Sequence, residues 1–477
     1  MPRTLVLVAL LALIACQPVD LRETDPPMPI NLDSCYCANA TRSQTTPCPD
    51  IPHEVVGTLG TGNFGPGYGG GLSPGIQPYF DVFSWQSFIA LNWPADSTGE
   101  PLDTMIGDAP GAPRVWELYD DPSVVFGDTT TSDCHARAAT DGQKLLTRMS
   151  KNSSVDPDGS FQEADGHPLI DRNLNFAVYE IKLNPDESQF VTTHNLTTVS
   201  GQSAYADSTE IELPSGYYDN DSLRTGGIVG AIEMKATWRI LDTAQGDDPD
   251  RYYHRDALVY VDSAHTEDGR PLCIEAIVGL VGLHISHKTQ AFTFWVWSTF
   301  EHIDNTPEVP SAQQPYDTTH YSFYNPECVY YCEPNAPPAL TGIDTVDKRY
   351  HWASTPPYAA KYATYDSFTQ KYFGSQITRV MPVYGPTKQV DNAFRKKMKG
   401  TVWENYRLIG SQWRLLADGP PFPLLDAPNV LANTTLESYI QPTASCVQCH
   451  SFASNSYQGK SFKTDFSFVL DIFAQQE

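Results

Sequence analysis

Positive charge is scarce in this 477-residue sequence. Lysine and arginine together number 31, aspartate and glutamate number 57, and the formal net charge at pH 7 is −26. Nucleic-acid binding depends on clustered lysine and arginine side chains that neutralise phosphates, so the charge balance excludes that class of partner. An acidic surface keeps a protein soluble and favours a basic partner. We interpret the acidity mainly as a source of solubility.

Long apolar runs are also missing from most of the sequence. Beyond the first 16 residues, the longest apolar stretch, 274–285, contains Glu275 and His284 and is too short for a transmembrane helix. The stretch 57–78 has nine glycines and three prolines but lacks the lysine and hydroxyl residue of a phosphate-binding loop. We therefore interpret residues 17–78 as a flexible Pro/Gly-rich tether.

The one long apolar run, residues 5–15, lies at the N-terminus. Arg3 precedes it, and it ends at Ala15-Cys16, a pattern typical of a bacterial lipobox in which the cysteine becomes the lipidated first residue. We predict that residues 1–16 are a lipoprotein signal peptide and that lipidated Cys16 is the sole contact with a membrane. An ordinary signal peptide is the alternative. Either interpretation places the protein in the bacterial cell envelope, in the periplasm or at the outer membrane.

A cofactor is indicated by the pentapeptide Cys446-Val447-Gln448-Cys449-His450. Two cysteines separated by two residues and followed at once by histidine are typical of covalent haem c attachment. Each thiol adds to one vinyl group of the porphyrin, and the histidine supplies a nitrogen ligand to the iron. A redox-active cysteine pair and half of a zinc site are the alternatives. We predict one covalent haem c, bound by Cys446 and Cys449, with His450 as axial iron ligand.

Seven other cysteines remain when Cys16 and the two cysteines of the motif are set aside. None of them belongs to a second haem motif, so we predict a single haem. In an oxidising compartment we expect up to three disulfides and one remaining thiol. Cys328 and Cys332 are the easiest pair to propose, because they close a small loop.

The residue pattern predicts a β-rich α+β fold in which an antiparallel sheet carries long loops and a C-terminal haem-attachment segment. Aromatic residues, at 12%, favour β-structure, and 38 prolines favour loops. The best-marked element is a hairpin over 273–302, with a nearly continuous apolar strand, a turn at 286–290 and an alternating second strand. We predict four regions: the signal peptide 1–16, the tether 17–78, a β-rich domain 79–340 and a C-terminal region 341–477.

Other elements follow from periodicity. Apolar residues at helical spacing predict a short buried helix over 83–94, which Pro94 ends. Residues 431–440 and 465–470 fit either a strand or a helix. We also predict helices over 114–118, 142–149 and 391–398, and strands over 175–181, 227–241, 255–261 and 402–415.

The haem motif lies unusually close to the C-terminus. Only residues 451–477 follow His450, and none of them is methionine. Ordinary electron-transfer cytochromes c place the motif early in a helical domain and use a downstream methionine as second axial ligand. That arrangement is excluded, so the sixth ligand comes from upstream or the position is open to a small molecule. The candidate distal ligands are His284, His302, Met381 and Met398, each of which also fits an ordinary structural role.

The position of the motif and the β-rich pattern resemble the cytochrome P460 and cytochrome c′-β group. The tail, residues 446–453 followed by Thr464-Asp465-Phe466-Ser467-Phe468, is similar to the ending of P460-type proteins. Segments 279–284 and 295–302 also resemble larger bacterial haem-c proteins of no assigned activity. The resemblance implies an antiparallel sheet and a lysine crosslinked to haem. Three lysines are candidates, and nothing in the sequence selects among them: Lys235, Lys288 and Lys397.

Three functions are compatible with this sequence. The first is electron transfer by an exported mono-haem cytochrome to a redox partner protein. The second, which the resemblance implies, is an open-site haem enzyme or sensor for a small oxidant or nitrogen oxide. The third is a binding protein with an auxiliary haem. Glu301 and the basic cluster 395–399 are further candidates, for proton transfer and for partner or propionate contacts, although an exposed strand end and a solvated helix face explain them equally well.

Overall fold

The structure, a computed structural model, describes most of the chain after residue 76 and a short segment before it. The predicted signal peptide, with Cys16, lies outside the described residues, as does most of the predicted tether. The described residues are 47–55, 77–127, 132–147, 167–217, 227–290, 293–308, 320–328, 332–338, 350–360, 363–414 and 428–476.

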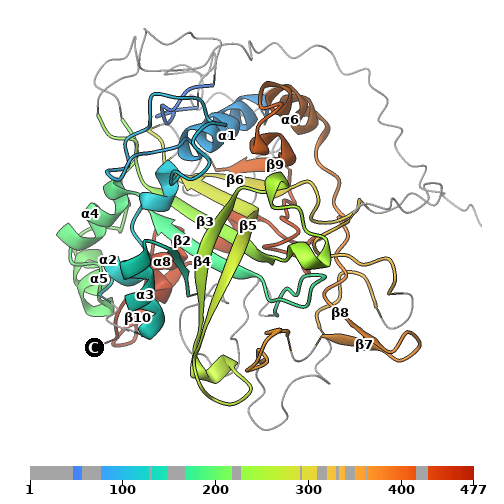
Figure 1. Cartoon of the computed structure of the whole chain (residues 1–477). Coiled ribbons are helices and arrows are strands. Elements are labelled where there is room, and N and C mark those ends of the chain that lie inside the picture. Colours follow the sequence, from blue (N-terminus) through green and yellow to red (C-terminus); the bar gives the residue numbers. More distant parts are fainter. Residues whose placement is uncertain are drawn as a thin grey trace, which may run out of the picture.

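The protein is a mixed α+β structure built on a seven-stranded, mostly antiparallel sheet (Figure 1). The central strand β5 pairs with β3 along one edge, and its other edge is shared by β4 and β6. β2 and β9 extend the sheet outward, and the parallel pair β1–β4 is the exception to antiparallel order. The strands are β1 Lys144–Leu146, β2 Val178–Leu183, β3 Ile232–Leu241, β4 His254–Val261, β5 Leu272–His287, β6 Val296–His302 and β9 Tyr406–Trp413.

The predicted hairpin at 273–302 is confirmed as β5 and β6. Their register pairs Ser286 with Trp297 and Gly282 with Glu301. Residues 278–283 are all buried, as expected for a nearly continuous apolar strand that is covered on both faces. The second strand starts later than predicted, at Val296, because Trp295 adopts a positive φ of 74° and turns the chain before the ladder begins.

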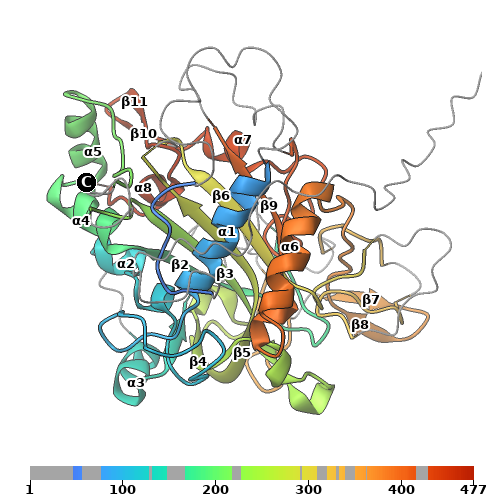
Figure 2. The same cartoon turned by 90° about the horizontal axis from the view of Figure 1, so that it is seen from above.

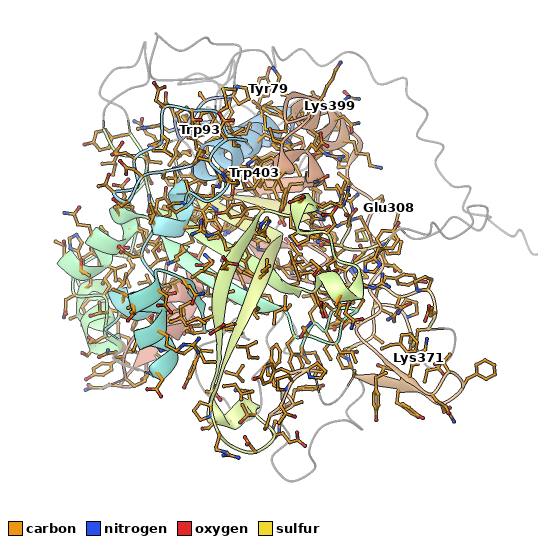
Figure 3. The ribbon with its side chains drawn as sticks, in the orientation of Figure 1. Tyr79, Trp93, Glu308, Lys371, Lys399 and Trp403 are labelled. Carbon is orange, nitrogen blue, oxygen red and sulfur yellow. A yellow bond between two sulfur atoms is a disulfide. The ribbon has the colours of Figure 1, made fainter. Side chains whose placement is uncertain are left out.

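One face of the sheet is covered by α1 Gln77–Leu91 and α6 Gly385–Lys397, which lie side by side in Figure 2. Aromatic side chains fill the space between these helices and the strands. Trp85 stacks on Phe394 with ring centroids 5.5 Å apart, and Phe88 stacks on Phe300 at 4.3 Å. The aromatic residues of the predicted 83–94 helix therefore pack in the core. Trp93 and Trp403 lie beside α1, and Lys399 extends outward near the end of α6 (Figure 3).

The opposite face is covered by smaller elements at one side of the sheet, near the C-terminus (Figures 1 and 2). Alternation along β6 separates the two layers. Ser298 bonds to Ser84 of α1 with oxygens 2.6 Å apart, whereas the ring of the neighbouring Trp297 lies 5.6 Å from that of His450. Successive side chains of a strand point to opposite faces. The elements of this second layer are α4 Pro185–Thr193, α5 Val199–Ala206, α7 Cys446–His450, β10 Ser454–Tyr457, β11 Lys460–Lys463 and α8 Phe468–Ile472.

Several predicted elements differ from the structure. Residues 142–149 were predicted as a helix but contain the short strand β1, which pairs with β4 in a parallel register. Residues 431–440 form turns, because their polar side chains bond to the sheet and to each other. β9 joins the sheet next to β6, so the sheet crosses the boundary predicted at residue 340. The remaining elements are α2 Pro122–Val125, α3 Asp133–Asp141, the hairpin β7 Thr364–Asp366 with β8 Lys371–Phe373, and 3₁₀ turns at Val115–Leu118, Thr243–Gln245, Pro249–Arg251, Ser263–His265 and Val402–Asn405.

Disulfides brace the fold outside the haem motif. Cys134 of α3 is bonded to Cys273 of β5 with an S–S distance of 2.08 Å. The predicted pair Cys328–Cys332 is confirmed. Cys48 is also disulfide-bonded. The total of up to three disulfides stays a prediction, because several cysteines lie outside the described residues.

Candidate haem-attachment site

The Cys446–His450 motif forms a single helical turn, α7. Ser445 caps it, accepting a hydrogen bond from the backbone N–H of Gln448 at 3.4 Å. Residues three apart in a helix lie on the same side, so the two cysteines are neighbours. Cys446 is half-buried and Cys449 is exposed, and in the described part of the chain neither forms a disulfide. Both side chains therefore retain the thiol chemistry that haem attachment requires.

The imidazole of His450 is oriented by a backbone carbonyl. Its Nδ1 lies 2.7 Å from the carbonyl oxygen of Phe466. A carbonyl can only accept, so Nδ1 carries the proton, and Nε2 is the ring nitrogen that could bind a metal. Histidines that bind metals usually donate their other ring N–H to such an acceptor. The rings of Trp297 and Phe468 flank the imidazole, with centroids 5.6 and 5.3 Å away.

The carbonyl that holds His450 belongs to a strained turn, residues 464–467, which we name the carbonyl turn. Asp465 and Phe466 have φ angles of 53° and 64°, so two consecutive residues other than glycine occupy the left-handed region. Each such residue costs about 1 kcal/mol or more, and such strain concentrates at functional sites. The cost is offset by bonds around the turn: Trp295 Nε1 donates to the Asp465 carbonyl at 2.8 Å, and Leu213 N–H donates to Asp465 Oδ2 at 2.7 Å.

Strand β9 holds the other side of α7. The side-chain oxygen of Gln412 accepts hydrogen bonds from Ser445 Oγ at 3.3 Å and from the Val447 N–H at 3.4 Å. The side-chain nitrogen of Gln412 donates to the Pro428 carbonyl at 2.6 Å. A fully buried amide thus links the rigid sheet to the start of the haem motif.

The surroundings of the motif are apolar and aromatic. Cys446 packs against two groups of buried side chains, one of which includes Leu431. Phe452, just beyond α7, is 68% exposed. The guanidinium of Arg414 lies 5.7 Å from the centroid of the Phe466 ring and adds a cation to this region. Two neighbouring thiols, an oriented imidazole, apolar side chains and a nearby cation fit a haem c.

Two candidate distal ligands remain, and His284 lies on the side of the sheet that carries α7. His284 is paired in register with Thr299, two positions from the Ser286–Trp297 pair, so it shares a face with Trp297. Its Nε2 is 3.5 Å from a carboxylate oxygen of Glu437. Met381 is half-buried and lies two residues before Val383, which packs in the same group of residues as Cys446. Both residues stay candidates.

The structure places the other two candidates elsewhere. Met398 is 1% exposed in the core beneath α1 and α6, on the opposite face from α7. His302 has both ring nitrogens engaged: one lies 2.9 Å from the Arg251 carbonyl, and the other accepts the Asp304 N–H at 3.1 Å. The His302 ring also stacks on Tyr252, with centroids 4.0 Å apart. Neither His302 nor Met398 is therefore arranged as an iron ligand.

The buried, neutral state of His302 gives the first stability prediction. Burial lowers its pKa from about 6.5 to about 4, although the Asp304 carboxylate and the Arg251 carbonyl oppose the shift. The unfolded chain therefore takes up a proton near pH 6.5, whereas the folded chain does so only near pH 4. Lowering the pH from 7 to 4 is expected to destabilise the wild type relative to His302→Gln by roughly 2–3 kcal/mol. Urea unfolding across this range measures the difference, and parallel curves for both proteins contradict it.

Other candidate residues differ in their relation to the motif. Lys235 is paired in register with His284, on the α7 face, whereas Lys397 belongs to α6 on the opposite face. Lys288 is 2% exposed and forms an ion pair with Asp465. Glu301 is fully buried against Arg379, which corrects its interpretation as an exposed strand end. The basic cluster at 395–399 begins in the last turn of α6 and ends just after it, on the opposite face from α7.

A group of carboxyls behind the carbonyl turn could not be anticipated from the sequence. Glu187 of α4 and Glu233 of β3 face each other, and Ser467 of the carbonyl turn donates a hydrogen bond to Glu233. Burial raises the pKa of Glu187 well above its usual range, and the Glu233 carboxyl adds to the shift. Burial also raises the pKa of Glu233 to about 7 and that of Asp465 to about 6, although hydrogen bonds and Lys288 oppose these shifts. No local pattern marks these residues, because they meet only through tertiary packing.

Comparisons with known proteins give no match for this chain. No family model, no curated protein and no solved structure matches it. In the described ranges, no group of three or more histidine, cysteine, aspartate or glutamate side chains is arranged to hold a metal ion by itself. None of the helices that the structure describes is long and apolar enough to cross a membrane.

Proposed function

We propose that this chain is an exported mono-haem c-type cytochrome, with haem bound covalently by Cys446 and Cys449 and with His450 as axial iron ligand. The observation that carries the proposal is the 2.7 Å contact between His450 Nδ1 and the Phe466 carbonyl within a CxxCH helix. A disulfide role for the motif gives no reason for this orientation of the imidazole. A zinc site would need further ligands, and no such group lies among the residues that the structure describes. When bound, the haem supplies one-electron chemistry.

The residues around the motif have separate tasks in this proposal. Gln412 and Ser445 fix the start of α7, so the two thiols keep their spacing. The Phe466 carbonyl holds a proton on His450 Nδ1 and prevents the ring from rotating. Trp297 shields the imidazole from water on the sheet side. The exposed Cys449 and Phe452 leave one side of the motif open to a redox partner, which supports electron transfer.

A second candidate function is ligand binding at an open iron position. The observation in its favour is that His302 and Met398, two of the four candidate sixth ligands, are buried elsewhere for structural reasons. The resemblance of the tail to P460-type proteins points the same way. An open position would suit a small oxidant or a nitrogen oxide.

Absorption spectroscopy distinguishes the two functions. For electron transfer we expect a low-spin, six-coordinate spectrum in both redox states, unchanged when carbon monoxide is added to the reduced protein. A high-spin ferrous form that binds carbon monoxide rapidly contradicts electron transfer and supports the second function. In that case, His284→Ala and Met381→Ala should leave the spectrum unchanged, because neither side chain is a ligand.

We also propose that the protein is anchored by lipidated Cys16 in the bacterial cell envelope. The signal-like leader supports this, as do the disulfides Cys134–Cys273 and Cys328–Cys332, which fit an oxidising compartment. Extraction of the protein from membranes by detergent but not by high salt tests the anchor, and release by salt alone contradicts it.

A further inference from the structure

We infer that the carboxyl pair Glu187–Glu233 is a proton-binding site that takes up one proton when the iron held by His450 is reduced. This inference rests on the proposed function, because it requires a redox-active iron at His450. The proton would bind at a site of its own, outside the haem motif.

The geometry of the pair favours a shared proton. Glu187 is fully buried, and neither of its carboxyl oxygens has a hydrogen-bond donor among the described residues. The group that faces it is the carboxyl of Glu233. Two carboxylates can form a hydrogen bond only if one of them is protonated, and two adjacent negative charges repel. Glu233 is only partly buried, so it gives protons from solvent a route to the pair.

Charged groups on the surrounding elements influence the protonation of the Glu187–Glu233 pair. The nearest other acid is Asp465, which is ion-paired with Lys288. The positive charge of Lys235 on β3 favours the ionised form of Glu233. The negative charge of Glu212 disfavours the ionised form of Asp465. Asp186, next to Glu187, accepts a hydrogen bond from the Gly230 N–H. The carboxyls of Glu187, Glu233 and Asp465 therefore lie near only two positive charges, those of Lys288 and Lys235. A change of charge nearby shifts the protonation of the carboxyl pair.

The carbonyl turn connects the pair to the axial histidine. Ser467 donates a hydrogen bond to Glu233, and the preceding residue, Phe466, accepts the one from His450. Adding an electron at the iron makes the region more negative and raises the proton affinity of nearby carboxylates. The electron comes from an external one-electron donor, and the proton comes from hydronium or a buffer acid in the solvent. The bond to the proton breaks in that donor as one O–H bond forms on the carboxyl pair, and no bond in the protein breaks.

The midpoint potential of the haem-loaded protein between pH 5 and pH 9 tests the inference. At a fixed electrode potential, raising the pH from 5 to 9 is expected to lower the ratio of reduced to oxidised protein. The decrease in the wild type should exceed the decrease in Glu187→Gln by a factor of at least about five. Asp391→Asn is the matched control, because burial raises the pKa of Asp391 to about 7 as well, but Asp391 lies on α6 on the opposite face. The control should retain the dependence of the wild type on pH.

Four results separate the outcomes. Equal pH dependence in the wild type and Glu187→Gln overturns the inference while leaving haem attachment intact. Protein without covalent haem instead refutes the proposed function. If Glu187→Gln does not fold, Glu233→Gln replaces it, and a wild-type dependence in that variant also overturns the inference. An infrared carboxylic-acid band that grows on reduction of the wild type, but not of the variant, supports it independently.

Discussion

Replacing Cys446 and Cys449 together by alanine is expected to abolish covalent haem. Both cysteines lie on one helical turn and keep their thiols, and thioether bonds to the porphyrin can form only from such thiols. After a denaturing gel, which removes non-covalent haem, the wild type should stain for haem and the double variant should show no signal. A single replacement should leave one thioether and a weaker signal.

The matched control removes two cysteines that lie elsewhere. Cys328→Ser with Cys332→Ser breaks a disulfide between two cysteines four positions apart in the sequence. This variant should keep the full haem stain, because its cysteines have no part in attachment. Undiminished staining of the Cys446/Cys449 variant contradicts the assignment, and loss of staining in the control shows that the effect comes from misfolding.

Arg379→Met is expected to cause the largest loss of stability, roughly 3–5 kcal/mol of the free energy of unfolding. Arg379 and Glu301 form an ion pair in which neither side chain is exposed. Glu301 also accepts the Thr434 N–H, and Arg379 Nη1 donates to the Ala432 carbonyl at 3.3 Å. Removing the arginine leaves a buried carboxylate without its main partner and releases the segment that leads to the haem motif.

Denaturant unfolding measures this effect against a surface ion pair. Arg270 is 82% exposed and pairs with Asp268, so Arg270→Met should change the free energy of unfolding by at most about 1 kcal/mol. Comparable small losses in the two variants contradict the structural role of Arg379. A large loss in Arg379→Met with normal haem staining of the folded fraction shows that the network stabilises the fold and is not needed for attachment.

Local patterns predicted the main elements of the fold. The hairpin β5–β6 was predictable because apolar alternation and a polar turn are encoded within 30 consecutive residues. The helix around Trp85 and Phe88 was predictable for the same reason, and the structure shows these aromatic rings packed in the core. The parallel strand β1 was not, because three residues carry little periodic signal and their pairing with β4 depends on a partner more than 100 residues away.

The candidate site was predictable only in its cysteines and histidine. The carbonyl that orients His450 belongs to Phe466, and backbone groups leave no mark in a sequence. Glu187 and Glu233 lie 46 residues apart and meet through the packing of α4 on the sheet. The burial of Glu301 was not predictable, because its partner, Arg379, is distant in sequence. Tertiary contacts, which no spacing rule describes, decide all three roles.

The haem motif near the C-terminus contacts both upstream strands and the residues that follow it. The sequence suggested that residues far upstream furnish the surroundings of the haem. The structure brings β6 and β9 against α7 through Trp297 and Gln412. It also shows that the 27 residues after His450 matter, since the carbonyl turn lies among them. The tail therefore orients the histidine, while the sheet supports the helix.

The central claim is the covalent attachment of haem to the Cys446–His450 segment, and peptide mass spectrometry tests it most directly. Trypsin should release residues 415–460 as one peptide, because no lysine or arginine lies between Arg414 and Lys460. From protein produced in cells that attach haem c, this peptide should carry the added mass of one haem and no alkylated cysteine. A peptide with two alkylated cysteines, or with a disulfide between them, and no haem contradicts the account.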